Sequence, residues 1–70
     1  MTKYQREILS YVEKNLILKG KEIFFGYDER SVVIIDNTKI LHFIYKDNKI
    51  SLVDSIVTIN TIKNRYKKAV

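Results

Sequence analysis

Apolar residues recur at helical spacing over residues 1–20, and polar residues occupy the other side of the helical wheel. The apolar positions are Tyr4, Ile8, Leu9, Tyr11, Val12, Leu16 and Leu18. Thr2, followed three residues later by Gln5, has the pattern of a capping box, and Gly20 is typical of the glycine that ends a helix. The sequence therefore predicts an amphipathic N-terminal helix that packs on a core.

The middle of the chain is rich in β-branched and aromatic residues, which form three runs separated by short polar segments. The runs cover residues 22–27, 31–36 and 39–46. Asn37 and Asn48 lie in polar segments that follow the second and third runs, and asparagine accepts the positive φ of a tight turn. This pattern predicts a three-stranded antiparallel meander. Gly26, inside the first run, indicates a bulge or a close approach of another group.

The predicted strands are apolar on both faces of the sheet. In the second run Val32 and Ile34 point to one face, whereas Val33 and Ile35 point to the other. A sheet with one face in water shows a polar residue at every second position, and this one does not. Both faces therefore need a cover, which is either a helix of the same chain or a second copy.

The last third of the chain carries conflicting signals. An apolar side of a helix would comprise Leu52, Ile56, Ile59, Ile62 and Tyr66. Ser51 and Asp54 also resemble a capping box, but the β-branched residues between positions 56 and 62 favour a strand. We predict a helix over residues 53–67 and keep the strand as the alternative. The predicted fold is α+β, in the order α-β-β-β-α, as a single domain of residues 1–70.

Self-association is expected from the first predicted strand. It carries no proline and no charge between Glu22 and Asp28, so its edge lacks the residues that normally discourage pairing. A free edge together with a spare apolar face favours a two-fold homodimer. The expected interface residues are Phe24, Phe25, Phe43 and Tyr45.

Basic residues outnumber acidic ones by 13 to 8, which gives a net charge of +5. No acidic residue follows Asp54, and the C-terminal segment holds the candidate nucleic-acid contacts Lys63, Arg65, Tyr66, Lys67 and Lys68. The same cations suit the negative end of a helix dipole, and the composition is rich in lysine throughout. We therefore keep DNA or RNA binding as the alternative function.

Residues with catalytic or metal-binding chemistry are scarce. The chain has no cysteine, which excludes disulfides and thiolate zinc sites, and its one histidine, His42, has apolar neighbours along its strand. Gly20 and Gly26 are the only glycines, so no glycine-rich phosphate loop exists. We expect no enzyme activity, no cofactor and no metal, with a toxin-type ribonuclease as a minor alternative. The apolar runs are too short to span a membrane, and we expect a cytoplasmic protein without membrane contacts.

The helix of residues 1–20 followed by the runs EIFFGY, SVVIID and KILHFIYK resembles the YopT-like family of small uncharacterised prophage proteins. The resemblance covers about residues 2–46 and is one of layout. It implies one helix and three strands per chain, a homodimer and no assigned activity, and the predicted second helix departs from it. We expect a small homodimeric, non-enzymatic protein of a prophage or another mobile element that acts through protein–protein contacts.

Overall fold

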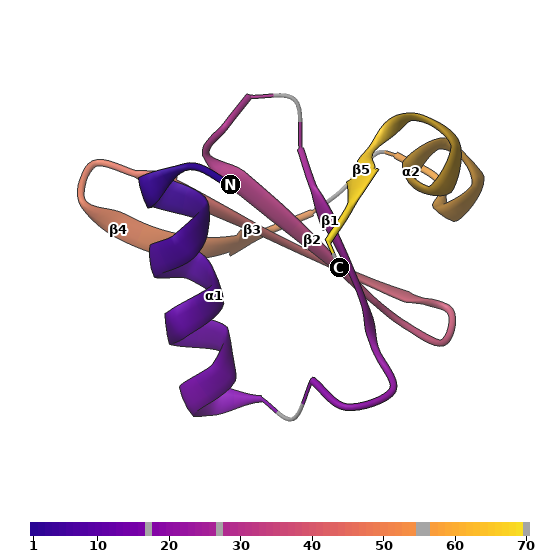
Figure 1. The fold of residues 1–70 in the computed structure, drawn as a ribbon, viewed down its shortest axis with the longest axis horizontal. Coiled ribbons are helices and arrows are strands. Elements are labelled where there is room, and N and C mark those ends of the chain that lie inside the picture. The colour runs from indigo at the N-terminus through magenta and orange to yellow at the C-terminus, as the bar shows by residue number, and fades with distance from the viewer. Residues whose placement is uncertain (17, 27, 55–56, 70) are drawn as a thin grey trace.

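The computed structural model describes residues 1–16, 18–26, 28–54 and 57–69, which form a five-stranded antiparallel sheet with one helix packed on each face (Figure 1). In chain order the elements are α1 (Lys3–Asn15), β1 (Glu22–Phe25), β2 (Ser31–Asp36), β3 (Lys39–Lys46), β4 (Lys49–Val53), α2 (Ile59–Arg65) and β5 (Lys67–Lys68). The strands lie in the order β4-β3-β2-β1-β5. The predicted α+β class is confirmed, but the described sheet contains more strands than predicted.

Helix α1 begins with the predicted capping box. The Gln5 backbone N–H donates to the Thr2 hydroxyl at 3.2 Å, and the Thr2 backbone N–H donates to Oε1 of Gln5 at 2.9 Å. The Gln5 side chain also donates to the carbonyl of Ser31 at 3.4 Å, which joins the start of the helix to β2. The helix ends at Asn15, earlier than predicted, and Gly20 lies in a following turn at φ +81°.

Strands β2 and β3 have the predicted bounds, and β1 ends at Phe25, while Tyr27 lies outside the described residues. Asn37 and Asn48 have φ of 58° and 60°, which confirms their predicted turn conformation. The predicted close approach at Gly26 is also confirmed, because a Cβ at this position would collide with the Ser31 hydroxyl. That hydroxyl donates to the carboxylate of Asp28 at 2.5 Å.

The prediction of a helix over residues 53–67 is only partly correct. Residues 49–53 form β4, so Ser51 lies within a strand and caps no helix. Helix α2 is shorter than predicted, and its N-cap is Thr58, whose hydroxyl accepts from the Thr61 backbone N–H at 3.2 Å. Residues 55–56, which the predicted helix included, lie outside the described residues. The two-residue turn after Lys46 brings residues 49–53 beside β3, and this pairing overrides their local helical pattern.

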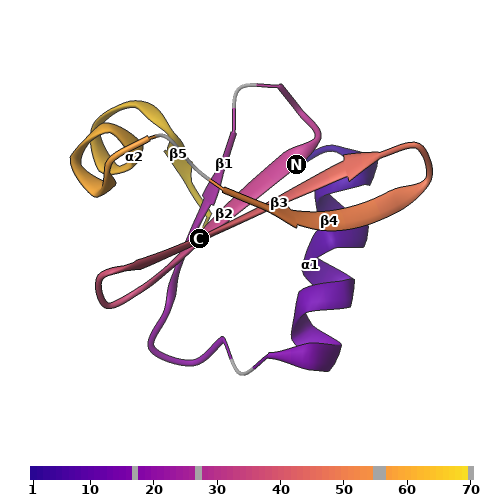
Figure 2. The same ribbon diagram turned by 180° about the vertical axis from the view of Figure 1, so that it is seen from behind.

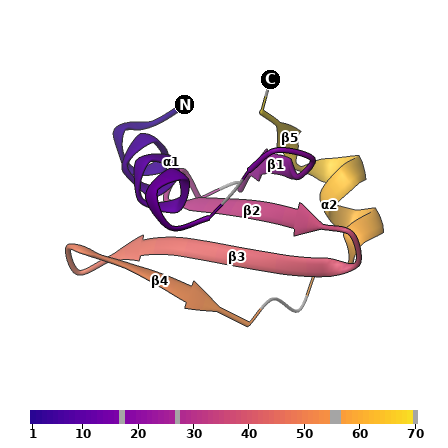
Figure 3. The same cartoon turned by 90° about the horizontal axis from the view of Figure 1, so that it is seen from below.

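The two faces of the sheet carry separate hydrophobic cores. On one face the α1-side core contains Ile8 and Val12 of α1 together with Val32, Ile34 and Phe43. On the other face the α2-side core contains Phe24, Val33, Ile35 and Ile62. The expectation that both faces need a cover is confirmed, and both covers are helices of the same chain. Figure 3 shows α1 and α2 toward opposite ends of the strands.

Replacement of Ile62 by alanine tests how far α2 depends on its core contact. Ile62 is fully buried in a seven-residue helix, so we expect Ile62→Ala to lower the free energy of unfolding by about 2–5 kcal/mol. Asn64→Ala, at an exposed position of the same helix, is the control and should change the free energy of unfolding by less than about 0.5 kcal/mol. Urea unfolding at one protein concentration measures the free energy of unfolding of both variants. Equal values for the two variants would show that the contact of α2 with this core does not stabilise the fold.

Candidate interaction surface

The two edges of the sheet differ in how well they are protected. Strand β1 is not an edge, contrary to the sequence-based expectation, because Phe24 and Phe25 pair with Lys68 and Lys67 of β5. Strand β5 is two residues long and consists of lysines, and a short cationic edge discourages pairing. Strand β4 has five residues and a single charge, Lys49, and no strand lies beyond it in the described part of the chain (Figure 3). The unguarded edge is therefore that of β4.

Backbone groups of Ile50 and Leu52 point outward from this edge. The Tyr45 N–H donates to the Arg30 carbonyl at 2.9 Å, on the β2 side of β3, so the neighbouring residues of β3 bond to β4. Ile44 is one of these residues, and its register partner in β4 is Ser51. Because bonding direction alternates along a strand, Ile50 and Leu52 turn their N–H and C=O groups away from β3.

Leu52 ends an apolar row that crosses the sheet on the α1 side. The register places Phe25, Val32, Phe43 and Leu52 side by side on β1 to β4. Val32 and Phe43 are buried, whereas Leu52 is 59% exposed. An exposed large apolar residue that continues a core row marks a contact site more strongly than an isolated one.

A groove of about 370 Å³ lies between α1 and β4. Its lining residues are Arg6, Glu7, Ser10, Tyr11, Lys14 and Ile50. The Tyr11 side chain is 45% exposed, and Ile50 is half-buried at the edge strand. Figure 2 shows the β3–β4 hairpin and α1 from behind. The groove thus combines apolar walls with a rim that carries both signs of charge.

An aromatic cluster supports the hairpin at the N-terminal end of α1. Tyr45, the register partner of Ile50, packs against Tyr4 with ring centroids 5.1 Å apart. The Arg30 guanidinium lies 4.3 Å from the centre of the Tyr4 ring. Burial, and then the nearby negative charge of Glu7, raise the pKa of the Tyr45 hydroxyl. These contacts hold the start of β4 beside α1.

The four predicted interface residues do not form one exposed surface. Phe24 is 2% exposed within the α2-side core, and Phe43 is 7% exposed within the α1-side core. Phe25 and Tyr45 are half-buried against the α1-side core. Because Phe24 and Phe43 are buried in cores of this chain, the structure gives no exposed surface made of all four rings, and an interface through Phe25 and Tyr45 stays a prediction.

The basic C-terminal segment is partly neutralised. Lys63 and Lys68 lie 3.4 Å and 3.3 Å from the carboxylate oxygens of Glu22. Lys68 first, and then Lys63, hold the pKa of Glu22 below its ordinary value, although burial opposes this. Tyr66 is half-buried against the α2-side core and does not present a free ring for stacking on bases. Lys67 and Arg65 are exposed.

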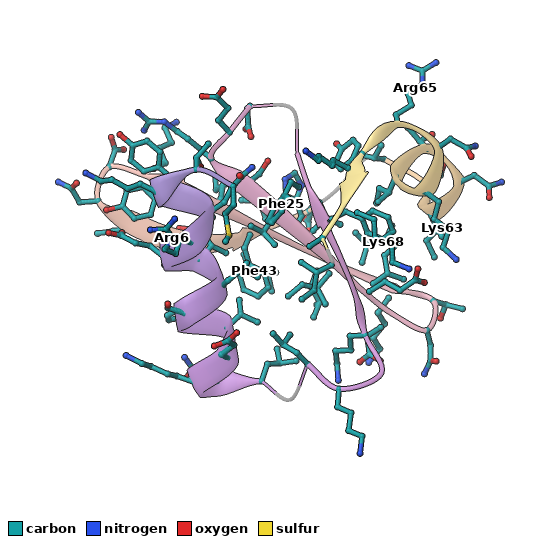
Figure 4. The ribbon with its side chains drawn as sticks, in the orientation of Figure 1. Arg6, Phe25, Phe43, Lys63, Arg65 and Lys68 are labelled. Carbon is teal, nitrogen blue, oxygen red and sulfur yellow. The ribbon has the colours of Figure 1, made fainter. Side chains whose placement is uncertain are left out.

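The basic residues of the two ends of the chain do not merge. Figure 4 shows Arg6 on α1, across the molecule from Lys63, Arg65 and Lys68. Arg6 and the basic residues of the C-terminal segment therefore do not share one cationic stripe. A continuous cationic surface is what phosphate backbones usually require.

His42 lies on the α2 side of β3, between Val33 of β2 and Val53 of β4. Neither ring nitrogen has a hydrogen-bond partner among the described residues. Burial lowers the pKa of His42, and the negative charge of Asp28 partly opposes this. Protonation of His42 is therefore less favourable in the folded state than in the unfolded chain.

Over the described ranges, no three His, Cys, Asp or Glu residues gather into a group that could hold a metal ion. A search of the same residues finds no helix that is long and apolar enough to cross a membrane.

Comparisons with family models, curated proteins and solved structures give no match for this chain. The resemblance to the YopT-like family, with the prophage setting it implies, stays a prediction.

His42 makes stability depend on pH in a defined direction. Its pKa is lowered on folding, so the unfolded chain binds the proton more tightly, and stability falls as the pH drops below about 6.5 toward the folded pKa. Since this is the only histidine, no other side chain has an ordinary pKa between about 5 and 8.

The melting temperature of the natural protein should therefore fall as the pH is lowered from about 7.5 to about 5, and that of the His42→Leu variant should not show this fall. The variant should also be about 1 kcal/mol more stable at neutral pH, because an unpaired polar group is no longer buried. If the melting temperatures of the two proteins depend on pH equally, His42 is not the source of the pH dependence.

Proposed function

We propose that this protein is a non-enzymatic homodimer that acts through protein–protein contacts, and that β4 forms its self-association edge. The observation that carries the proposal is the unguarded β4 edge beside the exposed Leu52. Unpaired backbone groups in a row form a template for another strand. A second copy offers the same donors and acceptors in the same spacing, so two-fold pairing satisfies both edges together.

DNA or RNA binding through Lys63, Arg65, Tyr66, Lys67 and Lys68 is the alternative. The exposure of Arg65 and Lys67 supports it. The pairing of Lys63 and Lys68 with Glu22 and the packing of Tyr66 reduce the charge and the aromatic surface that it needs. The geometry therefore favours protein contacts over nucleic acid.

Sedimentation equilibrium over a concentration series tests the dimer. We expect a mass of twice the 8.3 kDa of the chain, with dissociation in the micromolar range that suits a small interface. A mass that stays near 8.3 kDa at every concentration would rule out self-association.

Fluorescence anisotropy with a labelled mixed-sequence DNA duplex tests the alternative. We expect no binding even at low ionic strength, and only a weak gain in Glu22→Gln, which releases Lys63 and Lys68. Four phosphate contacts by the basic segment would instead give a log–log salt slope of about −3.6. Such binding by the natural protein would replace protein contacts with nucleic-acid binding as the preferred function.

A further inference from the structure

We propose a specific arrangement for the dimer: two β4 strands pair antiparallel about a two-fold axis at Ser51, so that Leu52 of each copy lies beside Ile50 of the other. This arrangement rests on the proposed function, because it requires self-association. It joins the two sheets into one continuous sheet and makes the second copy complete the groove between α1 and β4.

The direction of the free backbone groups selects this register. Ile50 and Leu52 carry the N–H and C=O groups that point away from β3. An antiparallel partner centred on Ser51 sets Ile50 of one copy opposite Leu52 of the other, and the reverse pair follows by symmetry. All outward groups of these two residues then form ladder hydrogen bonds, and the described strand overlaps its copy along its full length.

The charges at the ends of β4 favour the antiparallel direction. Lys49 begins the strand and Asp54 follows its last residue, and both are exposed. In the proposed register Lys49 lies opposite Val53 of the second copy, next to that copy's Asp54. A parallel arrangement in register would instead bring Lys49 beside Lys49 and Asp54 beside Asp54, which like-charge repulsion disfavours.

The apolar surface is complementary to itself in the same register. Ile50 and Leu52 both lie on the α1 side of β4, because their register partners are Tyr45 and Phe43. Ile50 of the second copy therefore continues the row of Phe43 and Leu52 beyond the edge. Leu52 of the second copy continues the neighbouring row of Tyr45 and Ile50. It also reaches the mouth of the groove that Ile50 and Tyr11 line. Each copy supplies the apolar side chain that the groove of the other lacks.

Cysteine cross-linking tests the register, because the natural chain has no cysteine. Ser51 is exposed and would face its own copy at a Cα–Cα distance of about 4.5 Å, the value for a non-hydrogen-bonded antiparallel pair. This distance lies within the range of a disulfide, so we expect Ser51→Cys to form a covalent dimer on mild oxidation.

Lys49→Cys is the matched control on the same strand and the same face. In the proposed register the two Lys49 positions are about 13 Å apart, beyond the reach of a disulfide, so this variant should remain uncross-linked. Efficient cross-linking of Lys49→Cys, or none of Ser51→Cys in a protein that sediments as a dimer, would overturn the arrangement while self-association stands.

Leu52→Lys provides an independent readout. Leu52 is largely exposed, so the substitution should leave the circular dichroism and the melting of the monomer unchanged, yet weaken dimerisation at least tenfold. Thr38→Lys adds the same charge at the exposed turn between β2 and β3 and should leave dimerisation unchanged. If Leu52→Lys dimerises like the natural protein, the β4 interface is wrong. A natural protein that is monomeric at all concentrations would remove the proposed function itself.

Discussion

The burial of β2 on both sides is the constraint from which the rest of the structure follows. Val32, Val33, Ile34 and Ile35 are consecutive, and none is more than 3% exposed. Because neighbouring side chains of a strand point to opposite faces, this run needs an apolar layer above and below it. Helix α1 forms the first layer, and α2 contributes Ile62 to the second.

The need for two layers explains why one sheet edge stays open. The two described helices each cover one face of the sheet, so neither lies along an edge. The last described residues return to β1 and pair with it through Lys67 and Lys68, which also brings Lys68 to Glu22. With α2 and β5 placed on that side, the described chain offers no element to cover β4 at the far side of the sheet. Among the described elements, the two that could have covered an edge are thus used on the α2-side face and beside β1.

The N-terminal helix and the first three strands could be predicted because their signals are local. The capping box at Thr2 and the asparagine turns at Asn37 and Asn48 depend on a few neighbouring residues, and the structure has them as expected. The segment after Asn48 was mispredicted because Leu52 fits a helical face as well as a strand. The better signal was the Asp47–Asn48 pair, whose φ values of 54° and 60° suit a two-residue hairpin turn. That turn would have predicted β4, and with it the candidate interaction surface.

By itself the sequence determined the composition of the two apolar faces, the turns that join the strands, and the absence of cysteine and of a glycine-rich loop. It could not determine which strand would be the edge, since β1 is protected by residues more than forty positions later in the chain. Nor could it show that Phe24 and Phe43 belong to opposite cores of one molecule. These features depend on long-range pairing and on which helix covers which face. Only the tertiary structure decided them, because burial is a property of the packed chain and residue type sets only a preference for it.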